Sequence, residues 1–138
     1  MNRQELLNQI EYYTPFNEQE ETDKQLILNW IRNNTNAFSR ENTVAHMTAS
    51  AWVVNQDKSK ILMVYHNIYN SWSWLGGHAD GETDLNVTYL LEADSEEAVS
   101  IKADENSGVA WFSPEEALKK STEPWFVEHV YSKLIEKM

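Results

Sequence analysis

Hydrophobic residues recur at helical spacing at the start of the chain. Residues 3–13 place Leu6, Ile10 and Tyr13 on one stripe, which is the pattern of a short amphipathic helix. Pro15 lacks a backbone N–H and therefore ends this helix. The sequence thus predicts a short helix before the first proline.

A second helix is expected from Asn17 to about Arg32. Asn17 is followed three residues later by Glu20, the pattern of a capping box, in which two side chains satisfy free backbone N–H groups at the helix start. Asn33 and Asn34 close the helix. Its predicted apolar face consists of Ile27, Trp30 and Ile31, with Leu26 beside them.

The pattern then changes to runs of β-branched and aromatic residues, which predict strands. Two such runs, 46–55 and 61–66, are separated by the polar turn 56–59 and indicate a β-hairpin. Trp72 and Trp74, two residues apart, are expected on one face of a strand and packed in the core. The remaining predicted strands are 71–75, 86–91 and 108–112.

Two helices are expected after the strands. The run SPEE at 113–116 provides a cap, a proline at the first helical position and a capping-box glutamate, so a short helix should reach Lys120. The run TEP at 122–124 opens a final helix. Its predicted apolar stripe consists of Phe126, Val130, Leu134 and Ile135. The order of elements indicates an α+β fold.

Charge and composition exclude several kinds of site and partner for this chain. The chain of 138 residues has no Cys, which excludes disulfide scaffolds, zinc-thiolate sites and thiol catalysis. Its 22 acidic residues against 11 basic ones give a net charge of −11, so neither nucleic acid nor an anionic membrane is an expected partner. No apolar run approaches the roughly 18 residues of a membrane helix, and no secretory signal is visible. A cytoplasmic protein is therefore expected.

The segment WSWLGGHADGE at 72–82 is the most informative about chemistry. A strand that runs into Gly76 and Gly77 lets backbone N–H groups approach a ligand closely, and the carboxylates of Asp80 and Glu82 follow. By itself, this pattern is equally compatible with a glycine-rich turn that ends in a solvated acidic tip.

Together with its surroundings, this segment resembles the start of a Nudix box, the G-x5-E-x7-R-E-U-x-E-E-x-G-U signature of Nudix hydrolases, where U is a bulky aliphatic residue. The hairpin before it and the run 104–112 with the SPEEA helix after it resemble the same fold. The run TEPW at 122–125 is similar to a bacterial subgroup that has an N-terminal helical extension.

The resemblance implies one Nudix-like domain over residues 1–138. A two-helix N-terminal extension, 1–34, would precede an α/β/α sandwich over 44–138. The box, however, does not finish. Counting from Gly76 places Glu82 on the first glutamate, whereas counting from Gly77 places Glu92 and Glu96 on later glutamates. Neither frame contains the arginine.

Two interpretations of the incomplete box remain. In the first, the box is cut after Leu85, residues 86–93 form a later strand, and the fold is shortened by loss of the catalytic helix and neighbouring strands. In the second, residues 86–99 form a degenerate catalytic helix, with Glu92 and Glu96 on one face where they could share a metal ion. The run VTY at 87–89 prefers strands, which favours the first interpretation.

The resemblance implies a pyrophosphohydrolase that acts on nucleoside diphosphate derivatives with Mg²⁺ or Mn²⁺. It carries Glu82 over as a catalytic residue and metal ligand, and Glu105 as a further base. Gly76, Gly77 and His78 become the phosphate-binding residues. Glu92 and Glu96 join the metal site only if residues 86–99 form the degenerate helix.

In the shortened form, hydrolysis is expected to be impaired or absent. The alternatives are a non-catalytic module that binds a nucleotide or a protein, and an internally deleted product without an activity of its own. A missing amphipathic helix would uncover roughly 300 Å² of apolar sheet, about 7 kcal/mol of lost burial. Either another segment of the chain or a second chain is therefore expected to cover this gap, and a homo-oligomer is the natural way to do so.

Overall fold

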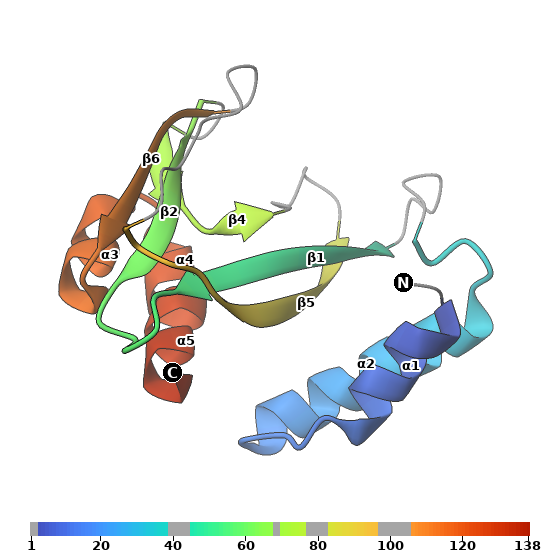
Figure 1. Ribbon diagram of the computed structural model, residues 1–138. Helices are drawn as coiled ribbons and strands as arrows, with labels where there is room; N and C mark the ends of the chain where they lie inside the picture. The colour runs from blue at the N-terminus through green and yellow to red at the C-terminus, as the bar shows by residue number, and fades with distance from the viewer. Residues whose placement is uncertain (1–2, 39–44, 68–69, 77–82, 97–105) are drawn as a thin grey trace. The chain divides into compact units, whose positions relative to one another are not determined.

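The computed structural model describes residues 3–38, 45–67, 70–76, 83–96 and 106–138, and it combines helices with a six-stranded sheet (Figure 1). This arrangement confirms the predicted α+β class. The chain groups into two compact units. The first unit comprises Met1–Thr48 and His78–Asn86, and the second comprises Ala49–Gly77 and Val87–Met138.

The first unit contains the two predicted N-terminal helices, α1 (Arg3–Tyr12) and α2 (Glu18–Asn33). The Asn17 side chain caps α2 by accepting a hydrogen bond from the Glu20 N–H at 2.9 Å. The predicted capping box is only half formed, because the Glu20 carboxylate accepts hydrogen bonds from the Phe16 N–H and the Tyr13 hydroxyl. The local sequence therefore predicted where α2 begins. It did not predict which groups donate hydrogen bonds to the Glu20 carboxylate.

The apolar face of α2 differs from the predicted one. Leu28 is 3% exposed and Ile31 is fully buried, whereas Leu26 is 51% exposed. Helical spacing alone allows a stripe through either leucine, and packing in the folded chain selects Leu28. The buried face of α2 therefore includes Leu28, which the sequence prediction did not name, and leaves out Leu26.

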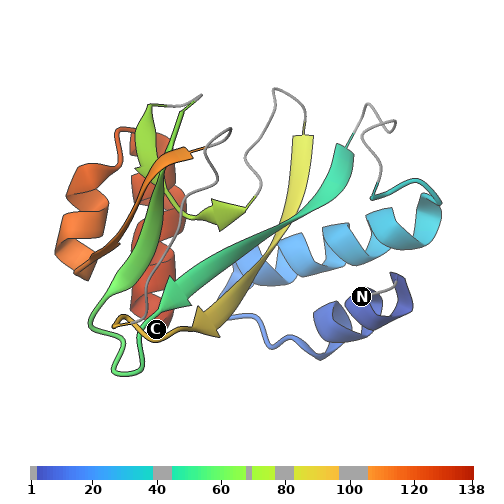
Figure 2. The same ribbon diagram turned by 45° about the horizontal axis from the view of Figure 1, so that its top comes forward.

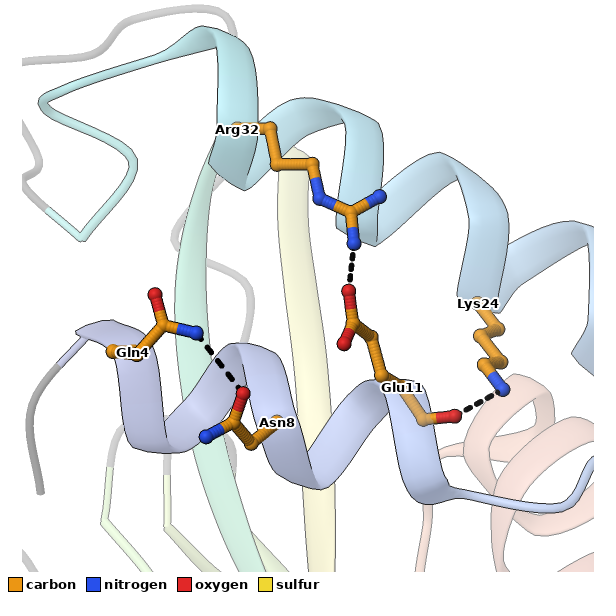
Figure 3. Close-up of polar contacts among 5 residues, drawn as sticks. All are labelled: Gln4, Asn8, Glu11, Lys24 and Arg32. Atoms are coloured by element: carbon orange, nitrogen blue, oxygen red, sulfur yellow. Dashed lines mark hydrogen bonds and ion pairs between the residues drawn. The ribbon is translucent and has the colours of Figure 1, made fainter.

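Basic side chains join α1 and α2 by binding carbonyl groups that the helix ends leave without a partner. Lys24 donates a hydrogen bond to the carbonyl of Glu11 at 2.8 Å, at the end of α1 (Figure 3). It donates a second one to the carbonyl of Tyr13 at 2.9 Å. Arg3 binds the end of α2 in the same way, through the carbonyl of Asn34 at 2.9 Å and that of Ile31. Arg32 also forms an ion pair with the Glu11 side chain. Each helix thus supplies a cation to the C-terminal end of the other.

The predicted hairpin is confirmed as β1 (Ala45–Val54) and β2 (Ile61–His66), which pair antiparallel with Val54 opposite Ile61. In the turn between them, Asp57 accepts hydrogen bonds from the hydroxyl of Ser59 at 2.6 Å and from its backbone N–H at 3.1 Å. These bonds lower the pKa of Asp57, since they favour its charged form. The polar residues therefore fix the turn locally.

The predicted strand at 71–75 is divided into β3 (Ser71–Ser73) and β4 (Leu75–Gly76), with Trp74 between them. β3 pairs with β2, with Ser73 opposite Val64, and β4 pairs with β1, with Leu75 opposite Ala51. Both pairings are antiparallel. This segment therefore passes from one strand of the hairpin to the other, as Figure 2 shows.

Two further strands complete the sheet: β6 (Asn106–Phe112) pairs antiparallel with β2, and β5 (Thr83–Glu92) pairs with β1. The Asn86 side chain donates a hydrogen bond to Thr48 Oγ1 at 3.0 Å. Ala93 N–H donates one to the Val54 carbonyl at 2.9 Å. The predicted strand at 86–91 is confirmed, and a helix that includes residues 86–92 is excluded.

The C-terminal helical region begins with α3 (Pro114–Lys120), whose predicted capping box is confirmed between Ser113 and Glu116. The hydrogen bonds with Ser113 lower the pKa of Glu116. The predicted final helix is interrupted: α4 (Pro124–Phe126) continues into the π-helical turn η1 (Val127–Tyr131) and then into α5 (Ser132–Lys137). None of the described helices has the length and hydrophobicity needed to cross a membrane.

The core of the second unit lies between its strands and its helices. Trp72 and Trp74 contact different partners: Trp72 packs edge-on against Tyr65 and Phe112, and Trp74 packs against Tyr131. The prediction that both tryptophans pack in the core is confirmed, but they are not on one continuous strand. The buried members of the core are Trp52, Val54, Ile61, Met63, Trp74, Phe112, Ala117 and Tyr131.

Candidate functional site

Gly76 ends β4 and is the described residue of the predicted phosphate-binding turn. Its φ of +118° lies in a region that residues with a side chain rarely adopt. A Cβ atom built on Gly76 would lie 2.6 Å from both the Ala49 carbonyl oxygen and the Ser50 Cα atom. Both neighbours are backbone atoms, which cannot move away by changing a side-chain rotamer. The position therefore requires glycine. The backbone of Gly76 is thus held tightly against β1.

The other residues that the sequence predicted for this turn lie outside the described residues. They are Gly77, His78 and Glu82. Glu105, predicted as a further base, also lies outside them. The structure therefore places one member of the predicted phosphate-binding and catalytic set, which is Gly76.

Glu92 and Glu96, the conditional metal ligands, are both exposed. Glu92 ends β5, and Glu96 lies in the following turn, where its N–H donates a hydrogen bond to Asp94 Oδ1 at 2.9 Å. They therefore do not share a helix face, because residues up to Glu92 are strand. The condition under which they would bind a metal ion is not met.

The pairing along β1 also separates Glu92 from the glycine turn. Gly76 is opposite Ser50, and Ala93, next to Glu92, bonds to Val54. Four residues of a strand span about 13 Å, so Glu92 lies beside a different part of β1 from the turn. Among the described residues, no group of three or more His, Asp or Glu side chains is placed to hold a metal ion.

The structure reveals a polar cluster around Tyr131 that the sequence did not indicate. Tyr131 is fully buried and stacks on Trp52, with 5.5 Å between the ring centroids. Its hydroxyl oxygen accepts a hydrogen bond from the Trp74 N–H at 3.3 Å. Burial raises the pKa of Tyr131 well above its ordinary value, and the charge of Glu123 raises it further. Tyr131 therefore stays neutral and acts as a hydrogen-bonding group.

The π-helical turn explains why sequence periodicity missed Tyr131. The Ser132 N–H donates to the Val127 carbonyl, five residues earlier, so the helix is locally wider than an α-helix. Because of this widening, each later side chain points in the direction that its neighbour in the sequence would have taken in a regular α-helix. A stripe drawn at α-helical spacing from Phe126 through Val130 therefore omits Tyr131, and no separate signal in the sequence marks it.

Ser71 connects this cluster to the loop before α4. The Thr122 N–H donates a hydrogen bond to Ser71 Oγ at 2.8 Å, and the Ser71 hydroxyl donates to the Trp72 carbonyl at 3.2 Å. Next along this loop, burial raises the pKa of Glu123. Ser73 Oγ and Trp74 Nε1 are buried without a hydrogen-bond partner.

The cluster around Tyr131 thus has buried hydrogen-bonding groups but no described pair of nucleophile and base. Its contacts position β3, β4 and α4, and so support the strand that ends at Gly76. The candidate ligand contact that the structure describes is the backbone of Gly76. Comparison with known proteins assigns no family, since no family model matches the chain and no curated protein matches it.

Proposed function

We propose that this chain is a shortened Nudix-like module that binds a nucleoside diphosphate derivative and does not hydrolyse it. The observation that carries the proposal is β5: a strand, Thr83–Glu92, stands where the resemblance would require the glutamate-bearing helix. The absence of a matching family model means that the Nudix resemblance rests on the sequence segment 72–82 and on the α+β arrangement around it.

The loss of hydrolysis follows from the geometry of a strand. Mg²⁺ and Mn²⁺ need several oxygen ligands in one place, and helical spacing of glutamates provides them on one face. In a strand, successive side chains point to opposite faces. Glu92 is the only acidic residue of β5 whose side chain is described, and it is exposed. The described residues of β5 therefore do not fit the metal site of the family, and no hydrolytic step is assigned to them.

Binding is supported by the turn at Gly76. Its positive φ and its close approach to Ala49 and Ser50 hold a backbone segment in one conformation beside β1. A glycine held in one conformation, without side-chain bulk, allows its backbone to come close to an anionic ligand. A net charge of −11 means that such a ligand needs this local set of donors, since the chain as a whole repels anions.

Two measurements on the purified chain test the proposal. The first is release of inorganic phosphate from a panel of nucleoside triphosphates, dinucleoside polyphosphates and nucleotide sugars, with Mg²⁺ and with Mn²⁺. We expect no turnover. The second is titration calorimetry with ADP and with the same nucleotide sugars, for which we expect saturable binding that inorganic phosphate alone does not reproduce.

Glu92→Gln and Glu96→Gln serve as matched variants, because each removes one charge and keeps the side-chain size. We expect both to bind nucleotide as the unaltered chain does. Turnover that either variant abolishes would overturn the non-hydrolytic proposal and restore a catalytic role for that glutamate. The absence of binding to every nucleotide would overturn the binding proposal.

A further inference from the structure

The sulfur atom of Met138 contacts the most deeply buried tryptophan of the chain. The indole Nε1–H of Trp52 donates a hydrogen bond to Met138 Sδ at 3.3 Å. Trp52 is 1% exposed and belongs to the buried core of the second unit. A buried indole N–H needs an acceptor, and a thioether sulfur is a weak one. Met138 therefore both packs against the core and provides the acceptor for a buried polar group.

The methionines that the structure describes differ in their exposure to solvent. Met63 is fully buried in β2, and Met47 is 8% exposed in β1. Met138 follows α5 and is only partly buried where it packs against the core. A thioether must be exposed to solvent for a dissolved oxidant to reach its sulfur atom. Of the described methionines, Met138 is therefore the one that such an oxidant reaches first.

We propose that Met138 is a site of reversible oxidation by hydrogen peroxide, and that its oxidation changes the hydrogen bond of Trp52 in the core. A lone pair of the sulfur atom attacks one peroxide oxygen, so that an S–O bond forms while the O–O bond breaks. A proton passes to the departing hydroxide, and the products are methionine sulfoxide and water. A methionine sulfoxide reductase reverses the step with two thiols as the reductant, which leave as a disulfide and water.

Oxidation changes the chemical group that Trp52 contacts. The sulfoxide is polar, and its oxygen is a stronger hydrogen-bond acceptor than the thioether sulfur. Trp52 also stacks on Tyr131, whose hydroxyl accepts the hydrogen bond from the Trp74 N–H. The modified group therefore lies next to the aromatic residues that hold β1 and the break between β3 and β4. This inference does not rest on the proposed function, because neither the oxidation nor its effect on Trp52 requires a nucleotide.

Treatment of the folded full chain with hydrogen peroxide, followed by mass spectrometry of its peptides, tests the site. We expect Met138 to gain one oxygen atom at least about tenfold faster than Met47 and Met63. In urea, where burial is lost, the three residues should react at similar rates. The peptide that contains Met1 is quantified separately. If Met47 or Met63 reacts as fast as Met138 in the folded chain, the proposal is overturned.

The effect on the core is measured by proton–nitrogen NMR of the tryptophan side chains. We expect oxidation of Met138 to shift the Nε1–H resonance of Trp52, because the acceptor of this N–H changes. The resonance of Trp125 is the internal control, since this side chain is 63% exposed and should shift less. A methionine sulfoxide reductase should return the Trp52 resonance to its original position. An unmoved Trp52 resonance in the oxidised chain would overturn the proposal.

Met138→Leu is the matched variant, because leucine keeps a large apolar side chain and removes the sulfur atom. We expect peroxide to leave the Trp52 resonance of this variant unchanged. Met47→Leu is the control: it keeps Met138 and should respond to peroxide as the unaltered chain does. A peroxide response that persists in folded Met138→Leu would also overturn the proposal. If circular dichroism shows that this variant does not fold, the oxidation rates and the Trp52 resonance of the unaltered chain decide.

Discussion

The hydroxyl of Tyr131 accepts a hydrogen bond from the backbone N–H of Trp74 at 3.3 Å. Trp74 stands between β3 and β4, where the chain passes from β2 to β1 and its backbone leaves regular strand pairing. A buried N–H without a partner is costly, so the tyrosine satisfies a group that the break in the strand sets free. The π-helical turn thus stabilises the strand that leads to Gly76.

Replacing Tyr131 by Phe tests this hydrogen bond. We expect the free energy of unfolding to fall by about 1–3 kcal/mol, because the Trp74 N–H is then buried without an acceptor. Urea denaturation followed by tryptophan fluorescence measures the change. Tyr12→Phe is the control, since Tyr12 is highly exposed and should change stability by less than about 0.5 kcal/mol. Equal effects of the two substitutions would refute the role assigned to the Tyr131 hydroxyl.

Replacing Gly76 by Ala tests the constraint on the glycine turn. The added Cβ would meet backbone atoms of Ala49 and Ser50 at 2.6 Å, and φ is unfavourable for alanine. We expect a loss of stability of at least about 2 kcal/mol in thermal or urea denaturation.

Gly108→Ala is the comparison for this variant. Its Cβ would lie 3.0 Å from an atom of the Trp72 ring and 3.3 Å from the Tyr65 Cβ, both farther away than the backbone atoms at Gly76. We expect a smaller loss than for Gly76→Ala. The reverse order would show that the backbone clash at Gly76 does not set the conformation of the turn.

The role of Asn17 as the cap of α2 is tested by replacing two asparagines with alanine, one at the cap and one inside a helix. The two substitutions are expected to change the stability in opposite directions. Asn17→Ala removes the hydrogen bond to the Glu20 N–H and should lower stability by about 1 kcal/mol. Asn8→Ala places a better helix former inside α1, where Asn8 is exposed, and should be neutral or slightly stabilising. Far-ultraviolet circular dichroism during thermal unfolding compares the two. A destabilising Asn8→Ala of the same size would contradict the assignment of Asn17 as the cap.

Glu123 gives a prediction about pH. Burial raises its pKa above the ordinary value of 4.5, so the folded state disfavours its charged form. A raised pKa in the folded state contributes stability below the unfolded pKa, and this contribution is lost as pH rises through the folded pKa. Glu123→Gln should therefore stabilise the chain at neutral pH and have little effect in acid.

Urea denaturation at about pH 7 and about pH 4 measures this difference. Glu136→Gln is the control, because Glu136 is an exposed residue of the same C-terminal helical region. It should leave the free energy of unfolding nearly unchanged at both pH values. A Glu123→Gln variant that is less stable than the unaltered chain at neutral pH would contradict the role of burial.

The sequence by itself determined the elements that depend on neighbouring residues. The turn between β1 and β2, the Asn17 cap and the Ser113–Glu116 capping box are each formed by side chains within a few residues of the groups that they bind. Such interactions need no knowledge of the rest of the fold. For the same reason, the β-branched residues of 86–91 were enough to predict a strand in a segment where a helix was the alternative.

Tertiary structure decided the features that depend on distant segments. Packing selected Leu28 instead of Leu26, the π-helical turn brought Tyr131 into the core, and pairing with two different strands divided the segment at Trp74. Of the candidate site, the sequence correctly singled out a glycine whose backbone conformation is special, because glycine itself carries that signal. It could not show that β1 places Gly76 and Glu92 beside different residues, since strand pairing joins segments far apart in the chain.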